Sequence, residues 1–115
     1  MRFTYYLNTQ FIDFLDKFLA KLNLDRSKFF RASVDFMIHS NTKMITCDPA
    51  ESPSEKSRVV IYYDHETEMQ IMYLKGLFFD TFNETDILYS CARSHMIALL
   101  EFYEDNGYKF DEEEF

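Results

Sequence analysis

The sequence has little glycine, proline or cysteine, and each shortage excludes a class of protein. Its 115 residues include two glycines, two prolines, two cysteines and no tryptophan. A turn-rich β-sandwich needs many more glycines and prolines, so we expect helices to dominate. No apolar run approaches the roughly 18–20 residues of a membrane-spanning helix, and the N-terminus lacks a signal-peptide pattern. A cytoplasmic protein without a membrane segment is therefore expected.

The cysteines and histidines show no spacing typical of a metal or redox site. Cys47 and Cys91 lie far apart without a C-x-x-C pair, and reduced thiols are the simplest interpretation. His39, His65 and His95 are scattered among different segments, which favours structural or surface roles. The sequence shows no glycine-rich phosphate loop, paired catalytic carboxylates or nucleophile–base set. We therefore expect no metal, cofactor, small-molecule substrate or enzymatic activity.

Apolar and acidic residues are plentiful. Thirteen Phe, eight Tyr and a hydrophobic content of 47 % can build a core, in one domain or in two very small intertwined units. The net charge of −8 speaks against nucleic acid as a partner. However, the first 38 residues have six basic and four acidic side chains, whereas the other 77 have six and sixteen. Any contact with phosphate is therefore expected from the first part of the chain.

The segment from Arg2 to Ile38 changes its periodicity twice. Apolar residues first alternate with polar ones, which predicts a strand with one buried face made by Phe3, Tyr5 and Leu7. After Asn8-Thr9 the apolar residues recur at helical spacing, and Asn23-Leu24-Asp25 separates this helix from a second one that begins at Arg26. The apolar faces of the two helices are Phe11, Ile12, Leu15, Phe18, Leu19 and Leu22, and then Phe29, Phe30, Ser33, Val34, Met37 and Ile38.

A polar stretch with both prolines follows, and we interpret it as a connection between two equivalent parts. Within it, Thr42–Cys47 is a weak candidate for a short strand. The acidic end of the chain is expected to be solvated surface; a rarer use is to compete with DNA or to bind a basic partner. The predicted division is a first unit at 1–40, a linker at 41–57, a second unit at 58–103 and a tail at 104–115.

The first pattern returns after the linker. Residues 58–63 predict a strand, 66–82 predict a helix, and the polar run 83–86 is a helix-start signal. A shift of 58 positions aligns the helices and the turn of the two units, and it would point Val60, Tyr62 and Asp64 outward. The predicted buried faces are Met69, Ile71, Met72, Tyr73, Leu77 and Phe78 in the third helix, and Ile87, Leu88, Cys91, Ala92 and Met96 in the fourth.

The order and spacing of the first unit resemble the ribbon-helix-helix family of DNA-binding proteins, to which the MetJ and Arc type of repressor belongs. The resemblance covers 2–38 without a gap, and includes the alternating strand, the Asn8-Thr9 pair and the Asp25-Arg26-Ser27-Lys28 turn. It implies that two strands pair antiparallel and enter the major groove of DNA as a ribbon. With its second copy, the chain is similar to single-chain tandem members among regulators from viruses of archaea, which would act in the host cytoplasm.

The expected fold class is therefore mostly α with a short antiparallel two-stranded ribbon, arranged as a tandem ribbon-helix-helix pseudo-dimer within one chain. One such unit of about 45 residues cannot bury enough surface to fold alone. Its single strand would also leave backbone groups unpaired. The two linked copies could pair their strands within one chain, or each copy could pair with its counterpart in a second chain.

The resemblance assigns base contacts to the outward side chains of the first strand, which are Arg2, Thr4 and Tyr6. Arginine can bind the O6 and N7 atoms of guanine, and threonine can use its hydroxyl or its methyl group. Tyr6 is bulkier than usual at this position, and could contact a thymine methyl group or a phosphate. The simpler interpretation is that these residues form the solvated side of an amphipathic strand.

Phosphate contacts are expected at the start of the second helix. Arg26, Ser27 and Lys28 follow the probable cap Asp25, where free backbone N–H groups and the helix dipole favour an anion. An ordinary capped helix start is the simpler interpretation.

The second copy departs from this pattern. Its matching positions are Glu84, Thr85 and Asp86, and the two acids would repel phosphate. The second unit is therefore expected to act mainly as a pairing scaffold, with Arg58 as a further candidate for a groove contact.

Two functions are compatible with these features. The first is a sequence-specific transcription regulator, most simply a repressor, that binds double-stranded DNA as a homodimer or higher homo-oligomer because a single ribbon makes few contacts. The alternative is an acidic protein-interaction module on the same fold that binds or inhibits a basic host protein, such as a nuclease or polymerase.

Overall fold

The computed structural model describes residues 2–40, 55–77 and 82–107, in which the order strand, helix, helix occurs twice. The expected class, mostly helical with a two-stranded antiparallel sheet, is confirmed. Within the described residues, no helix is both long and apolar enough to cross a bilayer. The candidate strand at Thr42–Cys47 and the predicted burial of Phe78 lie outside these residues. The elements are β1 (Arg2–Asn8), α1 (Thr9–Leu22), α2 (Arg26–His39), β2 (Lys56–Tyr62), α3 (His65–Leu77) and α4 (Glu84–Asp105).

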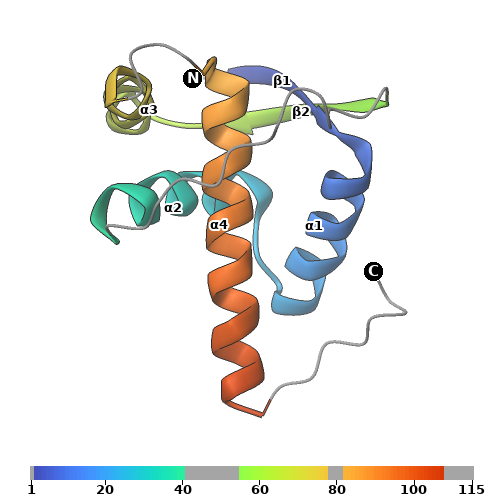
Figure 1. The fold of residues 1–115 in the computed structure, drawn as a ribbon. Helices are drawn as coiled ribbons and strands as arrows, with labels where there is room; N and C mark the ends of the chain where they lie inside the picture. The colour runs from blue at the N-terminus through green and yellow to red at the C-terminus, as the bar shows by residue number, and fades with distance from the viewer. Residues whose placement is uncertain (1, 41–54, 78–81, 108–115) are drawn as a thin grey trace.

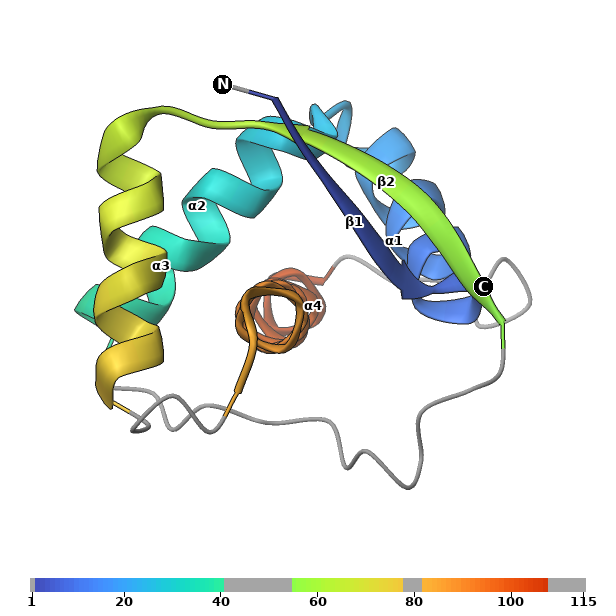
Figure 2. The same cartoon turned by 90° about the horizontal axis from the view of Figure 1, so that it is seen from above.

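The two strands pair with each other, so the ribbon forms within one chain. They run antiparallel, with Arg2 opposite Tyr62 at one end of the register and Asn8 opposite Lys56 at the other. The ribbon crosses one end of the molecule, with α1, α2 and most of α4 beneath it and α3 beside it at the same level (Figure 1). Seen from above, it extends over α1 and towards α2 and α3, while α4 lies end-on in the middle (Figure 2). The pairing joins the two halves of the chain through residues that are 48 (Asn8 and Lys56) to 60 (Arg2 and Tyr62) positions apart.

The two faces of the ribbon are as the alternation predicts. The outward side chains of β1 are exposed, and on β2 Val60 is half-buried and Tyr62 exposed. Asp64, beyond the end of β2, is exposed as well. The inward residues that are buried against the helices are Tyr5, Leu7, Val59 and Ile61.

Each helix begins at an asparagine or aspartate whose side chain accepts a backbone N–H of the first turn. These four caps are Asn8, Asp25, Asp64 and Asn83. At the other end of α1, Asn23 adopts a left-handed conformation with a φ of 53°. This conformation lets the Leu24 N–H donate to the Leu19 carbonyl at 2.9 Å, which ends the helix. Three residues separate the end of α1 from the start of α2.

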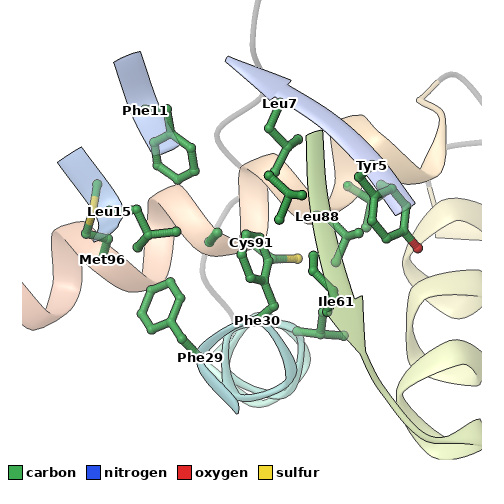
Figure 3. Packing of buried hydrophobic residues seen from close by; sticks show 14 of the residues in the cluster. Tyr5, Leu7, Phe11, Leu15, Phe29, Phe30, Ile61, Leu88, Cys91 and Met96 are labelled. Carbon is green, nitrogen blue, oxygen red and sulfur yellow. The ribbon is translucent and has the colours of Figure 1, made fainter. Parts of the chain in front are cut away.

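The core lies between the inward face of the ribbon and helices α1, α2 and α4 (Figure 3). The predicted buried faces of these three helices are confirmed, except that Leu22 and Ile38 are only partly buried. Small side chains on α2 and α4 allow these two helices to pack closely. The fully buried small residues are Ser33, Ser90, Cys91 and Ala92.

The predicted core of α3 is largely wrong. Ile71 is buried as expected, but Thr67 and Leu74 occupy the other inward positions. Apolar residues follow two stripes of this helix, and helical periodicity alone cannot tell which stripe faces the core. The residues on the outer stripe are between 52 and 58 % exposed, and they are Met69, Met72, Tyr73 and Leu77.

A half-buried histidine packs between α2 and α4. The His95 ring is stacked between Phe29 and Phe36, with centroid distances of 5.1 and 4.8 Å. Its Nδ1 lies 2.9 Å from the Ser33 Oγ, and the Ser33 hydroxyl donates to the Phe29 carbonyl. Nδ1 therefore carries the proton that is donated to Ser33. Burial lowers the pKa of His95, because it disfavours the charged imidazolium form.

Truncating a side chain on the inward face of β2 should lower the free energy of unfolding more than truncating one on the outward face. Ile61 is completely buried, so Ile61→Ala should lower the free energy of unfolding by about 2–5 kcal/mol. Val60→Ala, on the outward face of the same strand, should cost at most about 1 kcal/mol. Urea denaturation followed by circular dichroism measures both. A larger loss for Val60→Ala would contradict the assignment of the faces.

The half-buried histidine predicts a pH dependence of stability. Because the pKa of His95 is lowered in the fold, the unfolded chain binds the proton more readily. The free energy of unfolding should therefore be retained above the unfolded pKa of about 6.5, and should fall as the pH drops below it. Urea denaturation at pH 7.5 and 5.5 should show a smaller difference for His95→Gln. The control His65→Gln, at an exposed position, should behave as the unsubstituted chain.

Candidate nucleic-acid interface

The outward face of the ribbon is basic, although the whole chain has a net charge of −8. Arg2, Lys56 and Arg58 are exposed on this face, and its outward positions include no acidic side chain. Tyr6 and Tyr62 lie among them and are 57 and 54 % exposed. The basic groups favour an anionic partner. The exposed rings between them favour a partner that also has flat apolar groups.

The same arginine–tyrosine pair occurs twice on this face. Arg2 lies opposite Tyr62, and Arg58 lies opposite Tyr6, on either side of the pair formed by Thr4 and Val60. Because the strands are antiparallel, an approximate twofold axis perpendicular to the ribbon relates the two pairs. Duplex DNA with an inverted repeat has the same kind of symmetry.

This repetition is visible in the sequence only at the correct offset. Arg2-x-Thr4-x-Tyr6 corresponds to Arg58-x-Val60-x-Tyr62 when the strands are aligned with an offset of 56. The offset of 58 that aligns α2 with α4 hides it, because α2 begins 17 positions after the start of α1, whereas α4 begins 19 positions after the start of α3. Tyr62 was therefore not identified as a site residue from the sequence, and Lys56 was assigned to the linker.

The start of α2 is hydrogen-bonded to one end of the ribbon. The Tyr62 N–H donates to the Ser27 Oγ at 3.0 Å, and the Arg31 guanidinium donates to the Tyr62 carbonyl. The Ser27 hydroxyl accepts in this contact, so its own proton remains available to an anion. The structure thus brings one of the predicted phosphate-contacting residues next to the predicted base-contacting face.

The other two predicted phosphate-contacting residues have different surroundings. The Arg26 guanidinium binds both carboxylate oxygens of Asp16, at 2.7 and 2.8 Å. Both side chains are partly exposed, so this pair contributes only about 0–1 kcal/mol to stability. Lys28 is exposed, and its backbone N–H donates to the Asp25 cap at 3.0 Å. Within the described part of the chain, the N–H groups of Arg26 and Ser27 have no acceptor, as is usual in a first helical turn.

The corresponding helix start in the second half is acidic. Asp86 and Asn83 form a reciprocal cap, with bonds of 3.2 and 2.9 Å. Tyr5 donates to the Glu84 Oε2 at 3.3 Å, and the Tyr5 and Tyr63 hydroxyls are hydrogen-bonded. Burial is the main cause that raises the pKa of both tyrosines, so they stay protonated. The acidic groups here serve the cap and a buried hydroxyl, and they would repel phosphate.

Comparison with known proteins gives no match. No protein-family model matches the chain, and no curated protein or solved structure is significantly similar to it. Among the described residues, no three histidine, cysteine, aspartate or glutamate side chains are grouped as metal ligands would be.

Proposed function

We propose that this chain is a sequence-specific DNA-binding protein of the tandem ribbon-helix-helix type, in which one chain supplies both strands of the ribbon. The observation that carries the proposal is the exposed, basic and approximately twofold outward face of β1 and β2. A two-stranded ribbon is one of the few protein shapes that fits the major groove. The expected biological role is that of a transcription regulator, most simply a repressor that occupies its site.

The arginine–tyrosine pairs supply the chemistry of base recognition. An arginine at each end of the ribbon can donate two hydrogen bonds to a guanine, and each good contact of this kind discriminates by about 1–3 kcal/mol. Thr4 and Val60, between the two pairs, can contact a thymine methyl group. The proposed base-contacting residues are Arg2, Thr4, Tyr6 and Arg58.

The start of α2 supplies the proposed phosphate contact. The Ser27 hydroxyl lies beside the end of β2, and the unpaired N–H groups and the exposed Lys28 belong to the same helical turn. Arg26 can contact the same phosphate only if its ion pair with Asp16 breaks. The acidic start of α4 offers no equivalent, so DNA would be held firmly at one end of the ribbon.

Substitutions in the two parts of the interface should have different effects on binding. Arg2→Ala should relax the preference for one or two base pairs, because it removes a base contact. Lys28→Ala should weaken binding to all sequences and lower the salt slope by about one, because it removes a phosphate contact. Fluorescence anisotropy with a duplex selected from a random pool measures both. Lys17→Ala, an exposed lysine of α1, is the matched control and should change neither. Normal binding by both interface variants would refute these roles.

The ion pair at Arg26 predicts a variant with tighter binding. Asp16→Asn removes the carboxylate that holds the Arg26 guanidinium, so affinity for every duplex should rise several-fold with a steeper salt dependence. Asp13→Asn removes the same charge from α1 without any Arg26 contact. Equal effects of the two substitutions would show that Arg26 does not reach the phosphate.

An acidic protein-interaction module on the same fold is the second candidate, favoured by the net charge of −8 and by Glu84 and Asp86 at the start of α4. Selection from random duplexes distinguishes the two. Enrichment of a short motif supports the regulator. Failure to retain any duplex at low salt contradicts it and favours the module.

A further inference from the structure

Helix α3 presents an apolar surface that the described part of the fold does not cover. The residues follow a helical spacing of three or four positions, and they form one stripe opposite the buried side of the helix. Figure 2 shows α3 at the outer edge of the molecule, beside α2. Large exposed apolar patches on a small protein commonly mark a contact with another macromolecule. We call this surface the α3 stripe, and its residues are Met69, Met72, Tyr73, Gly76 and Leu77.

Helix α1 shows that the fold does not require an apolar stripe at this place. The offset of 56 that aligns the strands also aligns the start of α3 with the start of α1. The three buried positions of α3 then correspond to buried positions of α1, as for Ile71 and Leu15. The outward positions differ in chemistry. In α1 they are Asp13, Asp16, Lys17, Ala20 and Lys21.

A glycine lies in the middle of the stripe. Gly76 is exposed, and a methyl group added to it would meet no atom of the described chain within 4 Å. Glycine inside a helix costs about 0.5–1 kcal/mol relative to alanine, and α1 has Ala20 at the corresponding position. No contact within the described chain requires the missing side chain. A glycine on an apolar helix face does permit the close approach of a second helix.

We propose that the α3 stripe is a self-association surface on which α3 of a second copy packs antiparallel. The charged residues beside the stripe favour a second copy of α3 in the antiparallel orientation. Glu68 and Lys75 are seven positions apart, so they lie two turns apart on the same flank of the helix. In an antiparallel pair with twofold symmetry, like flanks meet, and Glu68 of each copy lies near Lys75 of the other. A parallel pair would instead bring Glu68 towards Glu66 of the second copy.

A shallow hollow beside the stripe fits the same arrangement. It has a volume of about 500 Å³ and lies between the last turn of α2 and α3. When Glu68 faces Lys75 of the second copy, Gln70 faces Tyr73 of the second copy. The Tyr73 ring can then enter the hollow, while methionine side chains adapt to the remaining surface. The residues that line the hollow are Ile38, His39, Glu66, Met69, Gln70 and Tyr73.

The proposal is tested by the mass of the full chain in solution, and it does not rest on DNA binding. Sedimentation equilibrium should show a concentration-dependent shift from 13.9 kDa to twice that mass. The double variant Met72→Asp/Tyr73→Lys introduces the residues that α1 has at the corresponding positions, so it should fold normally. We expect its dimer dissociation constant to be at least tenfold higher. The control Phe102→Asp replaces an equally exposed residue of α4 and should dimerise as the unsubstituted chain does.

Charge reversal tests the antiparallel orientation. Glu68→Lys and Lys75→Glu should each weaken the dimer about threefold, and the combined variant should restore it, because each pair is rebuilt with reversed signs. Circular dichroism and thermal melting of each variant verify that the fold is retained. A chain that remains monomeric at about 100 μM would overturn the proposal, as would a double stripe variant that dimerises normally. A combined variant weaker than either single one would overturn the antiparallel orientation.

Discussion

The pairing of β1 with β2 is the interaction on which the rest of the structure depends. Among the described residues, each strand has only the other as its neighbour in the sheet, so neither could satisfy its backbone groups alone. The register places Tyr5, Leu7, Val59 and Ile61 over the helices, where they complete a core that no single strand–helix–helix half could fill. The same register turns every arginine of the ribbon outward. Folding and the candidate interface therefore result from one set of cross-strand hydrogen bonds.

The two halves use the same scaffold for different purposes. At the start of α2, the half-buried Ser27 contacts the end of the ribbon and Lys28 is exposed, whereas at the start of α4 Glu84 accepts a hydrogen bond from a buried tyrosine. Conversely, the outer face of α1 is charged, and that of α3 is apolar. This division suits the proposal that one half holds phosphate and the other half associates with a second copy. It also explains how an acidic chain can present a basic surface, since no outward position of β1 or β2 holds a carboxylate.

Much of the fold follows from local sequence signals, and the rest depends on tertiary contacts. Alternation in β1, the polar helix-start signals at Asn8, Asp25 and Asn83, and the apolar stripes of α1, α2 and α4 each predict their element correctly. The cap of α3 was missed, because Asp64 was assigned to the outward face of a strand. The orientation of α3 was predicted wrongly, since Met72 and Ile71 are equally apolar and only the packing against α2 and α4 decides between them. The position of His95 between two phenylalanine rings has no sequence signal at all. Pairing within one chain could not be distinguished from pairing between chains, because both satisfy the same strand pattern.

A cysteine cross-link across the ribbon tests the account most directly. Thr4 and Val60 are directly opposite, and Cα atoms of such pairs are close enough for a disulfide. Thr4→Cys/Val60→Cys would be prepared with Cys47→Ser; Cys91 can stay, because burial raises the pKa of its thiol to about 12. After mild oxidation of a dilute solution, non-reducing electrophoresis and mass spectrometry should show a disulfide within one chain, two mass units below the reduced form. Cross-linked dimers, or free thiols at both positions, would contradict a ribbon made by a single chain.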